Sequence, residues 1–439
     1  MSFEGRLYLG MGAAGPLFAP REVAALLLGP PRSGKSSCLM MPNVAGHGGA
    51  VVSASTKPDV MEATVAARRE LGRCWLFDPS ATLAAPGGVE RVHWSPLHGS
   101  RHWDGATSVA RALVGARPGG LAQGEGAHWA ERAEALLAPL LHAASLAGLS
   151  MSEACSWVER HDLAPAEAIL ERWGAEIGSG VLEGIARTAP KEQASIFSTA
   201  AGVLAAYRSA SAREPGPMPI FDAESFVEGS DTLYICAPSH RQALLAPLVV
   251  GAVSDVRNAA YARATRLAQA GPTQGARSVL VALDEAANIA PLADLPSVAS
   301  EGGGQGLLSL VSLQDLSQAR RRWGAEADAF FTLFGAKVML PGVADRATLE
   351  LVSLLAGEEE LPVRSRSRGR TGRQRSSSAS LSLQRRQRLA PDAVARGRRG
   401  TALVLQGGEG ASRVALTPWG VAPREIGRER EPQSRELSR

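Results

Sequence analysis

Short apolar runs that end in turn-forming residues recur along the first hundred positions. The run over 22–28 is followed by Gly29-Pro30-Pro31, and further runs cover 50–54 and 74–78. Apolar runs of this length bounded by glycine or proline are typical of buried strands. The segment 59–71 between the second and third runs has helical spacing. The order strand, helix, strand predicts a parallel sheet of an α/β fold.

The pattern changes to consecutive helices over about 107–209. In the stretch 129–146, for example, Leu136, Leu137, Leu140 and Leu141 recur at helical spacing. Strand-like runs return at 232–236, 278–283, 307–313, 337–340 and 401–406. We therefore predict an α/β domain in two parts, 1–106 and 211–422, an inserted all-α domain over 107–210, and a disordered tail over 423–439.

Charge is distributed unevenly along the 439 residues. The formal net charge is +4, but residues 1–360 hold 29 basic and 37 acidic side chains, whereas 361–400 hold 12 basic and one acidic. The bulk of the chain is therefore mildly acidic. Any contact with a polyanion is expected to be confined to particular faces.

Cysteine and hydropathy patterns indicate a cytoplasmic protein. The four cysteines, Cys38, Cys74, Cys155 and Cys236, are far apart, which argues against a disulfide framework or a thiolate zinc site. The best apolar stretch, 243–253, contains Pro247 and is shorter than the roughly 18 residues that span a bilayer. The first residues do not have the pattern of a secretory signal.

A phosphate-loop pattern follows the first predicted strand. Gly29, Gly34, Lys35 and Ser36 occupy the defining positions, and a predicted helix comes next, which is the context that such a loop requires. We expect ATP to be bound by the whole segment, namely Gly29, Pro30, Pro31, Arg32, Ser33, Gly34, Lys35, Ser36 and Ser37. Lys35 would reach the β- and γ-phosphates, and the Ser36 hydroxyl would ligate Mg²⁺. The alternative is a glycine turn with an incidental lysine.

An acidic pair follows the apolar run 280–283. Asp284 and Glu285 would lie at the carboxyl end of a parallel strand, where open α/β sheets bind ligands. We expect Asp284 to hold the Mg²⁺ and Glu285 to polarise the attacking water. Alone, such a pair can also be a solvated strand end.

Three other residues are candidates for contact with the nucleotide. Gln314 ends the run 309–313 and could sense the γ-phosphate, although a solvated strand exit explains it equally well. Lys57 could contact phosphate, and Asp59 could cap the following helix. For both residues the sequence leaves open whether they take part in catalysis or are a helix cap and an ordinary loop charge.

An Arg/Ser-rich run of low complexity covers 363–388. It cannot bury a core, which predicts a solvated loop or a frayed hairpin. Its arginines could pair DNA phosphates without sequence preference, and no aromatic residue is available for stacking. The candidate contacts are Arg364, Arg366, Arg368, Arg370, Arg373 and Arg375. The alternative is a charged loop that keeps the hairpin soluble.

These motifs together resemble the coupling-protein family of conjugative and type IV secretion systems. The resemblance extends over roughly 20–420. Besides the phosphate loop, the acidic pair and Gln314, it rests on the segments 41–43, 55–59, 77–79, 128–129 and 335–337 and on the Arg/Ser hairpin.

The resemblance implies a RecA-like P-loop ATPase with an inserted all-α domain and a TraM recognition domain. It further implies a homo-hexamer that uses ATP and Mg²⁺ to bring DNA, with a bound relaxase, to the components of a secretion channel. Family members usually carry N-terminal transmembrane helices. This sequence resembles the membrane-less variants, so membrane association through partners is expected.

The sequence also differs from some family members at the arginine that acts on the nucleotide of the neighbouring subunit. Some members have a basic residue where this sequence reads 301–306, a glycine-rich segment. Arg320, Arg321 and Arg322 are the nearest alternatives, and a solvated basic helix turn explains them as well. Two other functions stay open at this point: a septum-type or HerA-like DNA translocase, and a substrate-docking adaptor without hydrolysis.

Overall fold

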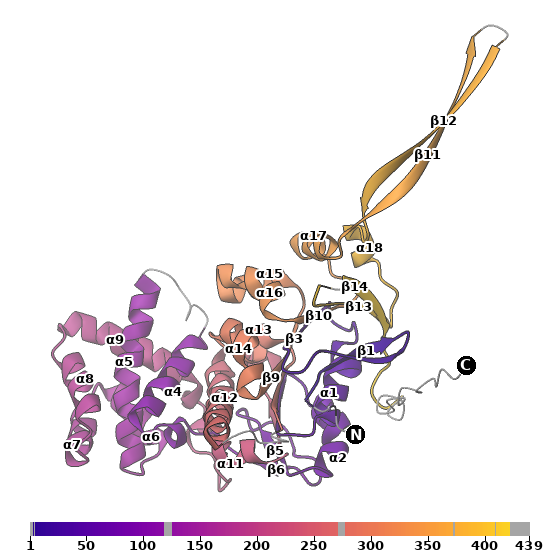
Figure 1. The fold of residues 1–439 in the computed structure, drawn as a ribbon. Coiled ribbons are helices and arrows are strands. Elements are labelled where there is room, and N and C mark those ends of the chain that lie inside the picture. The colour runs from indigo at the N-terminus through magenta and orange to yellow at the C-terminus, as the bar shows by residue number, and fades with distance from the viewer. Residues whose placement is uncertain are drawn as a thin grey trace.

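A twelve-stranded sheet forms the centre of the molecule (Figure 1). The computed structural model describes residues 3, 5–117, 125–270, 277–371, 374–408 and 410–421. The strands of this sheet are β1 Tyr8–Gly12, β2 Gly15–Phe18, β3 Ala25–Leu28, β4 Val51–Ser55, β5 Cys74–Phe77, β6 Glu90–Arg91, β7 Thr232–Cys236, β8 Val279–Leu283, β9 Leu307–Leu313, β10 Ala336–Met339, β13 Thr401–Gln406 and β14 Ala411–Ala415. Their order is β2-β1-β14-β13-β10-β3-β9-β8-β4-β7-β5-β6.

The pairing from β10 to β6 is parallel throughout, and the strands from β13 to β2 are antiparallel. Strands β3, β4, β7, β8 and β9 are buried along their whole length. Burial on both faces explains why these strands read as continuous apolar runs. The mostly parallel α/β sheet expected from the sequence is therefore confirmed, and β1, β2, β6 and β14 are strands that the sequence pattern did not indicate.

Helices cover both faces of the sheet. The longer ones are α2 Asp59–Arg69, α4 Trp103–Gly115, α5 Glu125–Leu146, α6 Met151–Arg160, α7 Ala164–Arg172, α8 Glu176–Ala186, α9 Pro190–Val203, α12 Gln242–Ala270, α15 Leu316–Trp323 and α17 Arg346–Leu355. The shorter ones are α1 Met41–Gly46, α3 Pro96–Gly99, α10 Ala210–Arg213, α11 Ala223–Glu228, α13 Ala286–Ile289, α14 Leu295–Glu301, α16 Phe330–Leu333 and α18 Pro391–Ala395. One core joins the sheet to α12 and the helical segment, and a second core lies between the sheet and α1 and α2.

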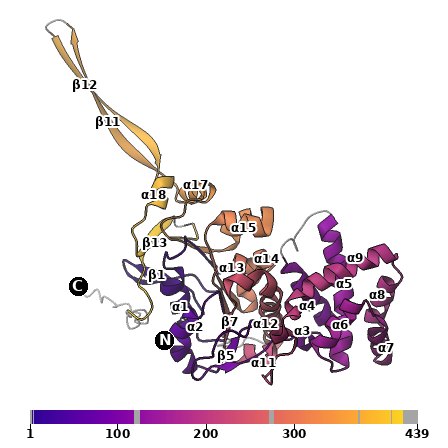
Figure 2. The ribbon, with the colours of Figure 1, turned by 180° about the vertical axis from the view of Figure 1, so that it is seen from behind.

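Between β6 and β7 the regular elements of the described residues are helices, apart from an isolated bridge at His93. They form a unit beside the sheet, with α5 packed against α4, α7, α8 and α9 (Figures 1 and 2). The segment 107–210 predicted as an all-α domain falls within this unit. Helix α4 begins before that segment, at Trp103, and packs on α12 of the α/β part.

Helix α12 differs from the sequence-based expectation for membrane spans. It runs for 29 residues with Pro247 inside it, so the apolar segment is longer than the stretch 243–253 expected from the sequence. It is the one helix among the described residues that is long and apolar enough to cross a membrane. Its most apolar window is 72% buried inside the protein, as in a core helix.

The Arg/Ser-rich run forms a long two-stranded ribbon that projects from the molecule (Figures 1 and 2). Its strands are β11 Glu358–Thr371 and β12 Gln374–Gln387, paired antiparallel from Glu358 opposite Gln387 to Thr371 opposite Gln374. We call this ribbon the arm. It makes a sheet of its own. The predicted disordered tail, 423–439, lies outside the described residues.

Candidate nucleotide site

The phosphate loop leaves the carboxyl end of β3 and enters a short helix, as its sequence pattern requires. Residues Ser36–Met40 are wound as a π-helix that continues into α1. Two positions in the loop have positive φ, Arg32 (63°) and Gly34 (105°). The conformation at Gly34 is one that residues with a Cβ rarely adopt, which is a physical reason for glycine there.

Lys35 is turned into its own loop. Its side chain is buried, and its Nζ donates hydrogen bonds to the carbonyl oxygens of Gly29 and Pro30. Burial lowers the pKa of Lys35 from its ordinary value, and the nearby carboxylates of Asp284 and Glu285 oppose this shift. To meet a phosphate, the ammonium group has to exchange these carbonyl bonds for phosphate oxygens.

Asp284 is held between two hydroxyl groups at the end of β8. Ser36 Oγ donates to Asp284 Oδ2 at 2.6 Å, and Ser312 Oγ donates to Oδ1 at 2.8 Å. Ser312 also accepts the backbone N–H of Glu285 at 3.0 Å. Since β9 lies between β3 and β8, Ser312 bridges the phosphate-loop strand and the acidic pair.

Glu285 has a left-handed backbone, with φ 58° and ψ 52°. Such a conformation costs a non-glycine residue free energy and is held only by its surroundings. Here the bond from its N–H to Ser312 and the start of α13 hold it. Its Oε2 accepts a weak bond from Asn288 Nδ2 at 3.3 Å.

These residues line a cavity of about 610 Å³ at the carboxyl edge of the sheet. Of the predicted nucleotide-binding residues, Pro31 through Ser37 line it, together with Asp284, Glu285, Lys57 and Asp59. Asp59 is in the first turn of α2, where its Oδ1 accepts the N–H of Val60 at 2.9 Å. Gly29 and Pro30 contribute through the carbonyls that bind Lys35.

The donor set fits Mg²⁺. The hydroxyl of Ser36 and the carboxylate of Asp284 are hard oxygen ligands beside a phosphate-binding loop, and Mg²⁺ binds few protein oxygens together with substrate phosphates. Among the described residues, no group of three or more histidines, cysteines, aspartates or glutamates could hold a metal ion by itself. A magnesium ion here would therefore depend on the nucleotide.

The sequence did not indicate four residues from the last part of the chain that also line the cavity, Arg399, Gly400, Leu416 and Pro418. The hairpin of β13 and β14 brings them there, and the N–H of Trp419 donates to the carbonyl of Ser37 at 2.8 Å. Arg399 is exposed and adds a cation to the cavity. In the sequence, Arg399 is marked only by its position close to a predicted strand. Its place in the cavity depends on the order of the strands in the sheet.

Gln314 lies at the end of β9, between the ends of β3 and β8, but it is not among the residues that line the cavity. Its backbone N–H donates to Gln318 Oε1 at 2.9 Å. The structure thus brings Lys35, Ser36, Asp284 and Glu285 together and leaves Gln314 at the margin of this group.

The three arginines considered as sources of a trans-acting cation lie in different settings. Arg322 donates to the carbonyls of Gly115, Arg117 and Pro291, which ties α15 to the end of α4. Arg320 pairs with Asp328 and lies near Asp345. Arg321 is exposed.

Of the six candidate DNA contacts, Arg364 lies on β11 and is exposed, with Leu381 opposite it in the register. Arg366, Arg368 and Arg370 belong to the backbone of β11 and Arg375 to that of β12, but their side chains lie outside the described part. Arg373 also lies outside the described residues.

A phosphate loop after a buried strand, an acidic pair two strands away and an intervening strand define a RecA-like P-loop NTPase fold. Solved structures of one protein share this fold. The bacterial conjugative coupling protein TrwBdeltaN70, in its unbound monoclinic form, aligns with a TM-score of 0.66 and 21% identity over 95% of this chain and 91% of that chain. TrwB with the GTP analogue GDPNP gives 0.67 and 21% over 93% and 89%, and TrwB with ADP and Mg²⁺ gives 0.66 and 20% over 92% and 88%.

The family described as the TraM recognition site of TraD and TraG matches residues 278–398. A search of curated proteins finds no match in sequence. The resemblance to conjugative coupling proteins predicted from the motifs is confirmed: residues 278–398 match the TraD and TraG family model, and the fold is that of TrwB over more than nine-tenths of the chain.

Proposed function

We propose that this protein is an ATP-hydrolysing coupling protein that brings DNA, with a bound relaxase, to a type IV secretion channel. The observation that carries the proposal is the bond between Ser36 Oγ and Asp284 Oδ2, because it joins the phosphate loop to the acidic strand in one cavity. Solved TrwB complexes with ADP and Mg²⁺ and with nucleotide analogues support nucleotide binding by this fold.

The roles of the side chains follow from their positions. Lys35 would leave the carbonyls of Gly29 and Pro30 and pair with phosphate oxygens. Ser36 and Asp284 would hold Mg²⁺, which neutralises charge on the phosphates when bound. Glu285 would accept a hydrogen bond from the attacking water, since its carboxylate borders the same cavity.

The arm supports the DNA part of the proposal. Arginine stands at every second position from 364 to 370, and alternate positions of a strand lie on the same face. With a rise of about 3.4 Å per residue, these positions recur roughly every 7 Å, which is about twice the 3.4 Å axial spacing of phosphates on one DNA strand, so successive arginines could meet every second phosphate. Sequence-independent contact with a DNA backbone is therefore the function we assign to the arm.

Three further parts of the proposal rest on the resemblance. We propose assembly as a homo-hexamer, contact with channel components, and work at the cytoplasmic face of the membrane through partners. The TraM recognition domain over 278–398 supports binding of a partner of the DNA-processing complex.

Separating nucleotide binding from turnover tests the catalytic assignment. We expect Lys35→Ala to lose binding of a fluorescent ATP analogue, because the loop loses its phosphate cation. Glu285→Gln should keep binding and lose turnover by roughly 10²-fold or more, because only the group that polarises water is changed. Equal turnover of Glu285→Gln and the wild type, measured as phosphate release, would remove Glu285 from the mechanism.

A further inference from the structure

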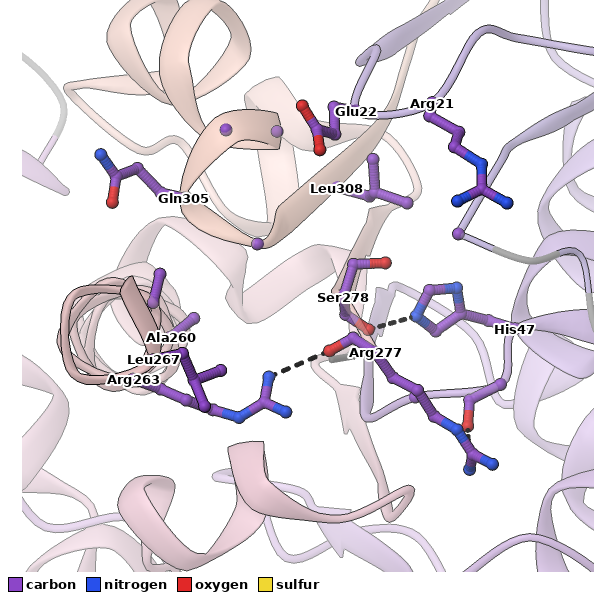
Figure 3. Close-up of a pocket in the computed structure, with 17 residues that line it drawn as sticks. Arg21, Glu22, His47, Ala260, Arg263, Leu267, Arg277, Ser278, Gln305 and Leu308 are labelled. Carbon is purple, nitrogen blue, oxygen red and sulfur yellow. Dashed lines mark hydrogen bonds between the residues drawn. The ribbon is translucent and has the colours of Figure 1, made fainter. Parts of the chain in front are cut away.

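A second cavity, of about 460 Å³, lies at the edge of the sheet opposite the nucleotide cavity (Figure 3). It is bordered by Ser278 and Leu308 at the amino ends of β8 and β9, by α12, and by the glycine-rich segment 303–306. The nucleotide cavity is at the carboxyl ends of the same strands. The two cavities are therefore separate sites, with the length of the central strands between them.

Positive side chains outnumber acidic ones in the lining. Arg21, Arg263 and Arg277 border the cavity from three different segments, and Glu22 is the acidic residue among the described lining residues (Figure 3). Arg263 of α12 also pairs with Glu228, through Nε to Oε2 at 3.1 Å, and Glu228 is shared with Arg266. The cavity keeps an excess of positive charge after Glu22 is counted.

Two of the guanidinium groups are held in position by the protein. Arg263 Nη1 donates to the backbone carbonyl of Arg277 at 2.9 Å. Arg277 Nη1 in turn donates to the carbonyl of Gly48 and to Ser230 Oγ, both at 3.0 Å. A guanidinium has five N–H donors, so these bonds leave others for a ligand. Fixed arginines lose less conformational entropy on binding than free ones.

A buried hydroxyl in the same cavity has no partner among the described residues. Ser278 Oγ is shielded from solvent, and no described group hydrogen-bonds to it. The carbonyl of Ser278 is fixed by His47 Nε2 at 2.6 Å, so the residue as a whole is well anchored. An anchored donor without an acceptor is uncommon in protein interiors and suggests that an acceptor binds there.

The segment 303–306 allows a ligand to approach the backbone closely. A Cβ at Gly304 would meet no atom within 4 Å, so this position faces open space. Gly306 has a φ of 73°, in the left-handed region that favours glycine. The cavity thus combines arginines, an unpaired hydroxyl and an open backbone.

We propose that this cavity is a second phosphate-binding site of the protein. Phosphate oxygens carry negative charge and accept several hydrogen bonds, which matches arginine forks and a lone hydroxyl donor. The phosphate could belong to a DNA backbone, to a nucleotide held by a second copy of the chain, or to a free phosphate compound. Phosphate binding in this cavity does not require ATP hydrolysis in the nucleotide cavity.

Binding of pyrophosphate to the full chain tests this proposal. In a Lys35→Ala background, calorimetric titration should still detect pyrophosphate, and adding Arg21→Gln or Ser278→Ala should weaken its affinity by tenfold or more. Arg187→Gln, which changes an exposed arginine just after the end of α8, is the matched control and should change nothing. Loss of all binding in Lys35→Ala alone, or unchanged affinity in both cavity variants, would overturn the site.

Two further titrations identify the source of the phosphate. If Arg21→Gln weakens binding of a labelled DNA oligonucleotide but leaves self-association unchanged, the ligand is a DNA backbone. If it removes self-association driven by ATP and Mg²⁺ in sedimentation, with DNA affinity unchanged, the ligand is the nucleotide of a second copy. A change in pyrophosphate affinity alone assigns a free phosphate compound.

Discussion

Two serines on β9 have different roles, although they lie three positions apart on the same strand. Ser312 Oγ holds Asp284 Oδ1, whereas Ser309 Oγ is buried without a partner among the described residues. The two hydroxyls cannot be told apart from the sequence, because both belong to one apolar run. Only the position of β9 between β3 and β8 places Ser312 beside Asp284 of the nucleotide cavity.

This difference predicts a selective effect of Ser312→Ala. Loss of one hydrogen bond to a charged carboxylate costs roughly 1.5 to 3 kcal/mol, so we expect Mg²⁺-dependent nucleotide affinity to fall about tenfold or more. Ser309→Ala is the matched control and should leave that affinity unchanged. A Mg²⁺ titration of ATP-analogue binding measures both. Equal affinities in the two variants would show that Ser312 does not position Asp284.

His47 couples stability to pH. It is fully buried and donates to the carbonyl of Ser278, and burial lowers its pKa to about 4, with Arg68 and Arg277 acting in the same direction. Because the unfolded chain takes up this proton near pH 6.5, the contribution is complete above that pH and is lost as pH falls towards 4.

The expected loss is about 3 kcal/mol over this interval, at 1.36 kcal/mol per unit of pKa. In His47→Gln the side-chain amide can still donate to Ser278, but it does not titrate. Urea unfolding between pH 7 and 4.5 should therefore show a smaller loss of stability for His47→Gln than for the wild type. The surface substitution His102→Gln serves as control, and parallel curves for wild type and His47→Gln would contradict the assignment.

At the scale of elements, the sequence predicted the buried parallel strands and the long helices best. Strands β3, β4, β7, β8 and β9 are apolar runs between turn signals, and local sequence is sufficient for such elements. The antiparallel strands β1, β2 and β14 were not predicted. None of them is buried along its whole length, so none appears in the sequence as a continuous apolar run.

The buried Arg68 of α2 is a helix residue whose burial the sequence pattern did not predict. Its guanidinium donates to Thr232 Oγ1 and to the carbonyls of His47, Gly49 and Ser230, which ties α2 to the starts of β4 and β7. In the sequence it is one of two adjacent arginines at the end of a helix, and the other, Arg69, is exposed. Tertiary contacts alone distinguish them.

The arm is the element whose removal should affect DNA binding without affecting the fold. Positions 364 and 381 are opposite each other in the register, so replacing 365–380 by an Asn-Gly turn closes a shorter ribbon. Five of the six candidate arginines would be lost. We expect an unchanged melting temperature, lower DNA affinity, and a salt dependence of log K reduced by up to roughly five, at about 0.9 per phosphate contact.

Fluorescence anisotropy with a labelled oligonucleotide at several salt concentrations measures these changes. A variant that replaces the same segment by glycine and serine, without shortening it, separates loss of charge from loss of length. Unchanged affinity across all salt concentrations would show that the arm has no contact with DNA.

For the whole molecule, the architecture explains the uneven charge of the chain. The mildly acidic bulk consists of the sheet domain and the helical unit, and most of the excess positive charge lies in and just after the arm. A surface of this kind does not coat DNA broadly. Under the proposed function, DNA contact is therefore expected only at particular faces, such as the arm.

Under the proposed function, ATP turnover in the cavity around Lys35 is coupled to DNA. The most direct measurement is steady-state phosphate release by the wild type and by Lys35→Ala, each with and without DNA. We expect turnover by the wild type that rises several-fold with DNA, and background turnover by Lys35→Ala under both conditions. Equal, negligible turnover of both proteins with and without DNA would contradict it and leave a docking function without hydrolysis.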